Sequence, residues 1–514
     1  MKNKKKLFIL LISCFLFGCD KPISEGVNIT SKGLEYEMYL NERFDKEIFY
    51  QNNGQVQASD PSVICVDGTY YMYPTNANNN GDCSYICGYK STNLTDWTYI
   101  DAVFVPNRNA WAIDGLWAPE VIEKDGTYYM YYSGYNQFTR RRGIGVAVSS
   151  CPEGPFVEYE GTLKDGTVVD YKTMPIDFEM PVIDPHPFID DDGKAYLFVS
   201  KDQVAGVSSI YGVELEDDMV SIKKETITGP LVQPDQAWEN PNGNNKWNEA
   251  PFVYKHGGLY YLTYSANYYQ STLYGVGYAT SSSPLGTYTK NVNNPILQVS
   301  SDWGHVSGTG HNCFFKSPDG NELFISYHSH VDVVAGGGVR KVNFDKVVFD
   351  EDGNMIVNGP SVTPQLLPSG SSPYKDITSL ATLTSTNTEN MEVLNDGIVN
   401  YHYDTVEEKE WYSNEKNSIT LTFEKNYKVK AIMVYDSADY ALAGNTYSLE
   451  FSKDKIKKVG FNPLYKYVDD FDWEVKVPGS AGIIQFNNLE TSMIKLTFNE
   501  EVSISEIVVV GEGD

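Results

Sequence analysis

Residues 184–200 read DPHPFIDDDGKAYLFVS, and this phrase has four further copies along the chain. Each copy holds an opening residue, usually a Pro, an apolar run, a turn with Asp or Gly, and a second run rich in Tyr. Self-similarity at a fixed period indicates a repeat architecture. The other copies are DPSVICVDGTYYMYPT at 60–75, APEVIEKDGTYYMYYS at 118–133, EAPFVYKHGGLYYLTYS at 249–265 and HNCFFKSPDGNELFISYHS at 311–329.

The spacing of the copies is nearly constant. The second positions are Pro61, Pro119, Pro185, Pro251 and Asn312, at intervals of 58, 66, 66 and 61 residues. In three copies a Ser follows the Pro at the same distance of 30 residues, so a second phrase keeps the register of the first. Apolar alternation around a DG turn predicts a hairpin. Four short strands at this period predict a β-propeller blade, so the sequence predicts five blades around a central channel.

Composition supports an all-β chain and excludes one class of partner. The 514 residues exceed one ordinary domain, and the 38 Tyr residues favour strands. Lys and Arg total 40 against 68 Asp and Glu, a net charge of −28. Nucleic acid requires a basic surface, so we expect no nucleic-acid partner.

The opening residues of the five copies are predicted to face one another across the channel. They are Asp60, Ala118, Asp184, Glu249 with Ala250, and His311. A single Asp-Pro pair is an ordinary turn signal. Three carboxylates in register on different blades raise one another's pKa, which is costly unless acid–base chemistry is needed. We therefore interpret Asp60, Asp184 and Glu249 as catalytic.

Glycoside hydrolysis needs such a set of carboxyl groups. One protonated group helps the leaving oxygen to depart, and one ionised group acts on the other side of the sugar. In inverting enzymes the ionised group is a general base that activates water. A third carboxylate can tune the pKa of the acid.

Residues 58–360 resemble glycoside hydrolase family 43, a family of five-bladed propeller enzymes. The matching motifs are ASDPSVI around Asp60, LWAPEV at 116–121, IDPHPFIDDDGKAYL at 183–197, NEAPFVYKHGGLYYLTYS at 248–265 and GTGHNCFF at 308–315. The resemblance implies Asp60 as general base, Asp184 as pKa modulator and Glu249 as general acid. It also implies inversion on furanosides or xylosides. Retaining invertase-type propellers usually carry Arg before the middle Asp-Pro, where this chain has Ile183.

Further residues are expected to line the channel. The resemblance implies that His311 contacts a metal ion, usually calcium, through water on the propeller axis, and that Arg340 bonds the sugar or the acid. Trp117 is expected to stack on a sugar or, alternatively, to pack between blades. Because calcium prefers six to eight oxygen ligands, one imidazole would need a largely hydrated ion. The run Arg140 to Arg142 is expected in an exposed, solvated loop.

The N-terminus predicts export and lipid attachment. A basic segment with four Lys precedes the apolar run 7–17, which is too short to span a bilayer. The run ends in LFGC, which resembles a bacterial lipobox and predicts lipidation of Cys19; an ordinary signal peptide is the alternative. We expect a bacterial outer-membrane lipoprotein facing the periplasm or the outside, with the membrane contacted through the lipid alone.

The last third of the chain changes pattern. Residues 361–375 are rich in Pro and Ser and predict a linker, and long alternating strands from 376 to 514 predict a β-sandwich (jelly roll). LNDGIVN at 394–400 and EWYS at 410–413 give it a resemblance to galactose-binding-like, discoidin-type domains. That resemblance implies carbohydrate binding or a spacer role, and a structural calcium near the NDG turn.

The expected domains are a signal peptide over 1–18, a tether over 19–50, the catalytic propeller over 51–360, the linker and the sandwich. We expect an inverting hydrolase of arabinofuranosyl, xylosyl or galactofuranosyl linkages in polysaccharides or oligosaccharides, with α-L-arabinofuranosidase as the first choice and no organic cofactor. Alternatives are a catalytically silent carbohydrate-binding propeller of a glycan-uptake system, a retaining fructan-type enzyme, and an adhesion or scaffold lipoprotein.

Overall fold

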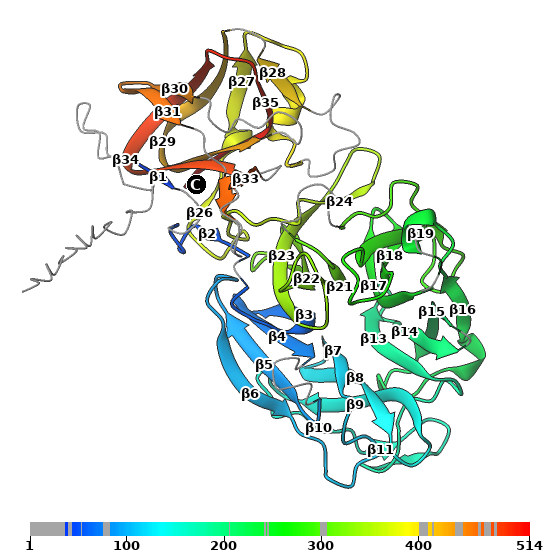
Figure 1. Ribbon diagram of the computed structural model, residues 1–514. Coiled ribbons are helices and arrows are strands. Elements are labelled where there is room, and N and C mark those ends of the chain that lie inside the picture. The colour runs from blue at the N-terminus through cyan, green and yellow to red at the C-terminus, as the bar shows by residue number, and fades with distance from the viewer. Residues whose placement is uncertain are drawn as a thin grey trace, which may run out of the picture.

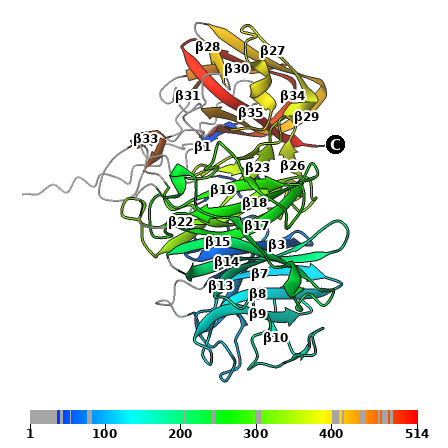
Figure 2. The ribbon, with the colours of Figure 1, turned by 90° about the vertical axis from the view of Figure 1, so that its right-hand side faces the viewer.

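The computed structural model shows two β-rich parts joined side by side (Figures 1 and 2). The structure describes residues 36–39, 44–52, 54–75, 83–204, 206–240, 243, 246–298, 306–399, 410–413, 416–436, 446–460, 464–466, 474–476 and 481–513. The predicted signal peptide and Cys19 lie outside these residues. In the described part of the chain, no helix has both the length and the apolar character needed to cross a membrane.

Residues 59–357 form five four-stranded antiparallel sheets, as the repeats predict. Each sheet runs from an inner strand outward in chain order. The first blade is β3 Ser59–Val66, β4 Thr69–Thr75, β5 Ile86–Ser91 and β6 Thr98–Phe104. The second is β7 Trp117–Lys124, β8 Thr127–Asn136, β9 Arg141–Ser149 and β10 Val157–Glu158. The third is β13 Val182–Ile189, β14 Ala195–Val204, β15 Val207–Leu215 and β16 Thr228–Val232. The fourth is β17 Asn248–His256, β18 Leu259–Ala266, β19 Gly275–Ser281 and β20 Thr289–Lys290. The fifth is β21 Gly310–Lys316, β22 Leu323–His330, β23 Arg340–Phe349 and β24 Met355–Val357.

The inner strands form a closed ring. Neighbours in this ring are β3, β7, β13, β17 and β21, and β21 contacts β3 again. In Figure 1 the yellow-green fifth blade accordingly returns beside the blue first blade. Five apolar clusters lie between the five pairs of adjacent blades, each built from residues of both partners. Tyr is frequent in these clusters because its ring fills the wedge between two twisted sheets while its hydroxyl can bond a main-chain group.

Non-covalent contacts join the first and last blades, among them a main-chain hydrogen bond from the Val342 N–H to the Val56 carbonyl at 3.0 Å and several bonds from side chains. The Asn52 side-chain amide donates to the Phe344 carbonyl at 2.8 Å and accepts the Phe344 N–H at 2.8 Å. The Asn52 side chain therefore makes the same two hydrogen bonds with β23 that a main-chain peptide group of a neighbouring strand would make. Gln51 adds a bond from its side chain to the Val362 carbonyl at 2.8 Å.

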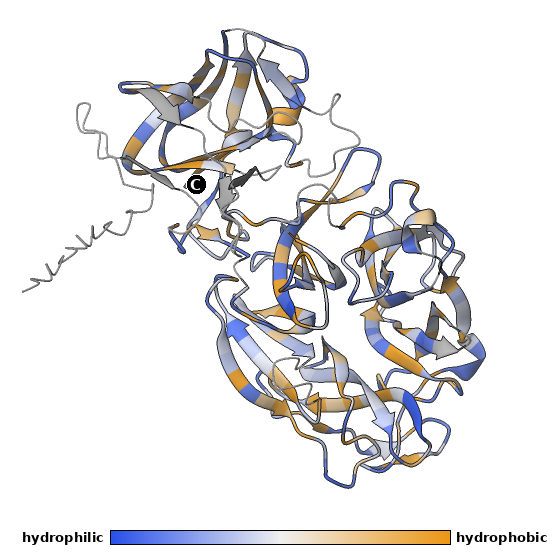
Figure 3. Cartoon of the chain, in the orientation of Figure 1, coloured by the Kyte–Doolittle hydropathy of each residue, from blue (hydrophilic) through white to orange (hydrophobic). Residues whose placement is uncertain are grey.

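The C-terminal part is one continuous nine-stranded sheet around its own core. The long strands β29 Asn417–Asp436 and β34 Ala481–Phe498 pair with each other along most of their length. The first half of β29 also pairs with β27 Ala381–Ser385, and its second half pairs with β35 Val502–Glu512. Both halves contribute to the core, and Figure 3 shows hydrophobic residues on these strands. The likeness to a galactose-binding domain stays a prediction. The other strands of this sheet that follow the propeller are β26 Tyr374–Asp376, β28 Trp411–Ser413, β30 Thr446–Phe451 and β31 Lys455–Gly460. β32 Leu464–Lys466 and β33 Glu474–Lys476 form a separate two-stranded sheet.

The segment expected as a tether is partly built into the fold. β1 Tyr36–Tyr39 adds a strand to β34 of the C-terminal sheet. β2 Phe49–Tyr50 pairs with β25 Gln365–Leu366, which lies inside the segment expected as a linker. Ile48 and Phe49 are fully buried in a cluster with residues of β29, β34 and β35. The N-terminal segment and the expected linker therefore both take part in the fold, although most of their neighbours in the sequence are polar.

Candidate active site

The same local distortion opens every inner strand. The pairing of each inner strand with its neighbour shifts register at one place, which is a β-bulge. One residue in each bulge has a positive φ between 43° and 54°. These five residues are Asp60, Ala118, Asp184, Ala250 and His311. Such a conformation is costly for residues other than Gly, so it persists because the surrounding contacts hold it.

The contact that holds each bulge comes from the preceding blade. The main-chain N–H at the left-handed position donates to a hydroxyl on the second strand of that blade in four cases. The four acceptors are Thr75, Ser133, Ser200 and Ser265, at 2.7 to 2.9 Å. At the closure between the fifth and first blades, His328 Nδ1 accepts the Asp60 N–H at 3.2 Å. A ring of hydrogen bonds between neighbouring blades therefore surrounds the channel.

The three predicted carboxylates meet at this ring, but from two different positions. Asp60 and Asp184 occupy left-handed positions, whereas Glu249 is one residue earlier, before the left-handed Ala250. All three are nearly buried, with 9%, 7% and 7% of their surface exposed. Asp184 Oδ2 accepts the Ala250 N–H at 3.2 Å, so it lies against the segment that carries Glu249.

Asp60 lies among nitrogen atoms of the fifth blade. Its Oδ1 atom is 3.1 Å from Arg340 Nη1 and 3.3 Å from both His311 Nδ1 and His328 Nδ1. Burial alone would raise the pKa of Asp60, but His311 and the Arg340 guanidinium outweigh it and hold that pKa well below its ordinary value. Asp60 is therefore an ionised carboxylate at neutral pH.

Glu249 has the opposite surroundings. Burial raises its pKa well above the ordinary value, and the nearby Asp184 carboxylate raises it further. Its Oε1 atom accepts a hydrogen bond from the Tyr274 hydroxyl at 2.9 Å. Burial likewise raises the pKa of Asp184, and the charge of Asp60 adds to this while His311 opposes it. One channel thus holds two carboxyl groups whose pKa values are shifted in opposite directions, downward for Asp60 on the first blade and upward for Glu249 on the fourth.

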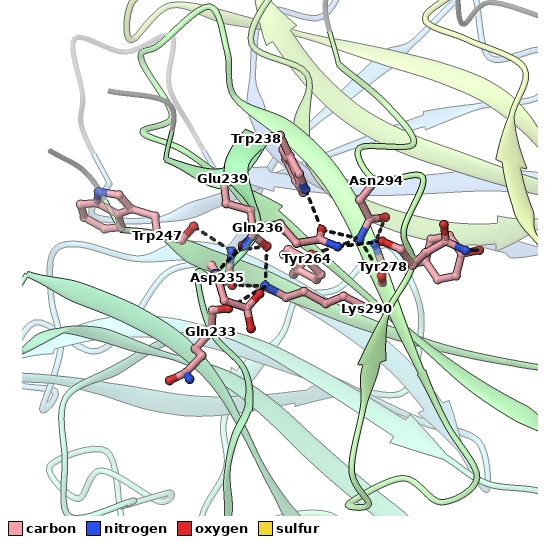
Figure 4. Close-up of polar contacts among 12 residues, drawn as sticks. Gln233, Asp235, Gln236, Trp238, Glu239, Trp247, Tyr264, Tyr278, Lys290 and Asn294 are labelled. Carbon is pink, nitrogen blue, oxygen red and sulfur yellow. Dashed lines mark hydrogen bonds and ion pairs between the residues drawn. The ribbon is translucent and has the colours of Figure 1, made fainter. Parts of the chain in front are cut away.

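The strand that carries Glu249 begins at a buried ion pair (Figure 4). Glu239 is fully buried, and its Oε1 atom is 2.5 Å from Lys290 Nζ. Lys290 also donates to the Gln233 carbonyl at 2.6 Å and to Asp235 Oδ1 at 2.8 Å. Glu239 and Lys290 both reach the side chain of Asn248, the residue before Glu249, at 3.4 Å. This network anchors the start of β17.

Trp117 and Arg340 have distinct places in the channel. Trp117 precedes the left-handed Ala118, so it holds in blade 2 the position that Glu249 holds in blade 4. The Arg142 guanidinium lies 3.6 Å from the Trp117 ring centroid and covers that face of the indole. Arg340 pairs with Asp60 and lies over the Tyr269 ring at 4.8 Å.

The expectation for the arginine run is wrong for two of its members. Arg141 and Arg142 are the first residues of β9, with side chains only 25% and 24% exposed. Arg141 pairs with Asp177 at 2.6 Å, and Arg142 lies 3.4 Å from Asp202. The run spans the end of a hairpin turn and the start of a strand, so two of the three guanidinium groups turn inward.

Sequence reasoning also missed two residues of the site, Tyr274 and His328. Tyr274 follows the β18–β19 loop, outside the repeated phrases. His328 takes the place of the Ser or Thr of the other blades, and the Ser329 that follows it disguises this exchange.

The side chains that the structure describes do not form a coordination shell for calcium. Among the residues with defined placement, no group of three or more His, Cys, Asp or Glu could hold a metal ion, either on the axis or in the C-terminal part. The residues present therefore do not by themselves fit the oxygen-rich shell that calcium prefers.

Comparisons with known proteins agree with this geometry. The model of the family "Glycosyl hydrolases family 43" matches residues 54–355. A β-D-galactofuranosidase of Aspergillus niger is 28% identical over 311 residues, covering 58% of this chain and 81% of that protein. An extracellular endo-α-(1→5)-L-arabinanase of Bacillus subtilis is 28% identical over 328 residues, covering 58% of this chain and 62% of that protein. The crystal structure of a thermostable family-43 glycoside hydrolase is 36% identical, with a TM-score of 0.55, covering 62% of this chain and 99% of that one. The chain therefore belongs to glycosyl hydrolase family 43 and is a glycoside hydrolase.

Proposed function

We propose that this hydrolase inverts the anomeric centre, with Glu249 as general acid, Asp60 as general base and Asp184 as modulator of the acid. The observation that carries the proposal is the opposite pKa shift of two nearly buried carboxyl groups in one channel. An inverting enzyme needs this pair, an acid that keeps its proton at working pH and a base that does not.

The reaction follows in a single displacement. Glu249 gives its proton to the glycosidic oxygen while the bond from that oxygen to the anomeric carbon breaks. A water molecule attacks the anomeric carbon from the opposite face and gives a proton to Asp60. The products are a sugar of inverted configuration and the released alcohol, and proton exchange with solvent restores both carboxyl groups.

The neighbouring side chains support these two roles. Asp184 bonds the main chain beside Glu249 and keeps negative charge near it, which favours the protonated acid. Arg340 favours the ionised base. We assign Arg340 and the face of Trp117 opposite Arg142 to sugar binding, with Arg142 holding the indole in place.

The substrate we propose is a furanoside. The two relatives named above are a galactofuranosidase and an arabinanase. β-D-Galactofuranosyl and α-L-arabinofuranosyl groups both present a five-membered ring. We take the terminal α-L-arabinofuranosyl group of a polysaccharide or oligosaccharide as the first substrate, with xylosyl and galactofuranosyl groups as the others.

The chemistry proposed for the carboxyl groups needs no organic cofactor. A calcium ion on the axis would contact His311 through water, and a second ion at the NDG turn would need oxygen ligands beyond the Asp396 and Glu506 carboxylates. We derive no step through either ion.

We also propose a lipid anchor at Cys19, supported by the lipobox-like LFGC. It would attach the enzyme to a bacterial outer membrane, where polysaccharide fragments are met. Radiolabelled palmitate incorporation in cells, compared with Cys19→Ala, tests this separately from activity.

The activity test uses α-1,5-linked arabino-oligosaccharides, a β-D-xyloside and a β-D-galactofuranoside, with product anomers followed by NMR. Wild-type enzyme should cleave at least one and release the inverted anomer first. Glu249→Ala should lose several hundredfold, since general acid catalysis contributes roughly 10²–10⁴-fold. The control Glu225→Gln changes an exposed residue and should keep full activity. A retained anomer would contradict inversion, and no cleavage by any variant would favour a silent binding propeller.

A further inference from the structure

Tyr274 is the neighbour of Glu249 that the mechanism above leaves unused. It lies directly before β19 and is fully buried. Its hydroxyl group donates to Glu249 Oε1 at 2.9 Å. A buried Tyr hydroxyl ordinarily bonds a main-chain group or water, so a bond to the acid of the active site calls for an explanation.

The surroundings of Tyr274 favour this direction of donation. The His311 main-chain N–H donates to Ser265 Oγ at 2.7 Å. The Ser265 hydroxyl lowers the pKa of Tyr274, although burial raises that pKa more. A lower pKa makes the phenol a better donor, which favours donation of the Tyr274 hydrogen to Glu249 Oε1.

The ring of Tyr274 is held in place on both sides. It stacks on His328 with ring centroids 5.6 Å apart and an angle of 7° between the planes. On another side lies Gly310, where an added Cβ atom would come within 2.1 Å of the Tyr274 ring. The hydroxyl therefore cannot swing away from Glu249 without moving the neighbouring blade.

We propose that Tyr274 is a positioning residue that selects the reactive oxygen of the general acid. Because Oε1 accepts the Tyr274 hydrogen bond, the acidic proton resides on Oε2, the oxygen left to meet the glycosidic bond. This inference rests on the proposed acid role of Glu249. A carboxyl group without such a bond could carry its proton on either oxygen, and only one of the two arrangements would be productive.

The charges around Glu249 give the direction of the pH effect. Asp184 and Asp60 raise the pKa of Glu249, whereas Arg340 and the Tyr274 hydrogen bond lower it; Tyr268 also lies nearby. The acid is active while protonated, so activity falls as pH rises through its pKa. Removing the Tyr274 hydroxyl raises that pKa, and the basic limb of the pH–rate profile must move to higher pH.

The test is Tyr274→Phe, assayed on arabinofuranosides with a 2,4-dinitrophenyl group and with an unactivated alkyl group. Loss of a hydrogen bond to an acid is worth roughly 10–100-fold, so kcat on the alkyl substrate should fall by that factor. The loss on the activated substrate should be below about threefold, since a good leaving group needs little protonation. KM should change little, and the basic limb should shift upward.

Two further variants separate positioning from simple packing. Tyr278→Phe removes another buried hydroxyl of β19, which bonds Asn291 and Met355, and should leave both the limb and the leaving-group dependence unchanged. Ser265→Ala should reproduce both changes at smaller size, because the Ser265 hydroxyl lowers the pKa of Tyr274 and its loss makes Tyr274 a weaker donor to Glu249.

An equal loss of activity on both substrates, or an unmoved basic limb, would overturn the inference. If Glu249→Ala abolishes cleavage of the alkyl substrate while Tyr274→Phe behaves as wild type, this inference fails and the proposed function stands. If Glu249→Ala keeps full activity, the proposed function fails.

Discussion

The base side and the acid side of the channel differ in charge and not in burial. Asp60 and Glu249 are almost equally buried. Asp60 faces the nitrogen atoms of Arg340 and His311, and its pKa falls. Glu249 faces a phenol and a carboxylate, and its pKa rises. Burial by itself favours the neutral form of either group, so the neighbours decide which carboxyl group loses its proton.

The two sides also differ in where their main chains are held. Asp60 lies at the closure of the ring, where His328 replaces the hydroxyl found at the other four junctions. Burial lowers the pKa of His328 to about 3, so the imidazole is neutral and its Nδ1 can accept the Asp60 N–H. Glu249 lies one residue before its bulge, on a strand anchored by Glu239 and Lys290. Each side can therefore be disturbed separately.

The largest expected effect comes from removing either functional group. Asp60→Asn should lower kcat by roughly 10²–10⁴ on every substrate, because activation of water is needed whatever the leaving group. Glu249→Gln should lose a similar factor on unactivated glycosides and far less on 2,4-dinitrophenyl glycosides. Steady-state kinetics on the two substrate types measures this. The same leaving-group dependence in both variants would contradict the assignment of acid and base.

The next effect concerns the anchor of the acid side. Lys290→Met leaves the fully buried Glu239 carboxylate without its counter-ion, which should lower the free energy of unfolding by about 3–5 kcal/mol. The control is Lys194→Met, which breaks an ion pair of two side chains that are 57% and 53% exposed. It should cost no more than about 1 kcal/mol. Urea unfolding of both variants checks this, and equal stabilities would show that the Lys290 pair contributes little.

The smallest expected effect tests the base side of the channel through the pKa of Asp60. Arg340→Met removes a cation beside Asp60, so the pKa of Asp60 should rise. The base is active while ionised, and its activity is lost as pH falls through that pKa. The acid limb of the kcat/KM profile should therefore move to higher pH, with a loss at neutral pH of about 10-fold. The basic limb should move less than the acid limb. Arg141→Met breaks a pair with Asp177 and should leave the acid limb in place.

Much of the propeller was predictable because the repeats mark the number of blades and the start of each inner strand. The period of the phrases corresponds to the blades, and register alone brought Asp60, Asp184 and Glu249 to one channel. Long alternating runs likewise predicted β29, β34 and β35. These features depend on patterns along the chain, which a sequence displays directly.

The rest depends on contacts between distant segments. Tyr274 lies directly before β19, the third strand of the fourth blade, and outside the repeated phrases. His328 is followed by a Ser that imitates the other copies, and only the pairing of β21 with β22 shows which residue faces Asp60. Arg142 lies in a run of three arginines, and its stacking on Trp117 depends on where the hairpin turn ends. None of these positions follows from a local period.

The junction between Asn52 and Phe344 has a consequence for how the blades of such a chain can be reordered by gene rearrangement. Since only non-covalent contacts hold that seam, the closure of the ring does not depend on which blade comes first in the chain. A gene rearranged to begin at another loop, with the original seam bridged by a short peptide, would encode the same ring of inner strands. If the new start lay between Asp60 and Glu249, the acid would precede the base along the chain while both kept their places in the channel.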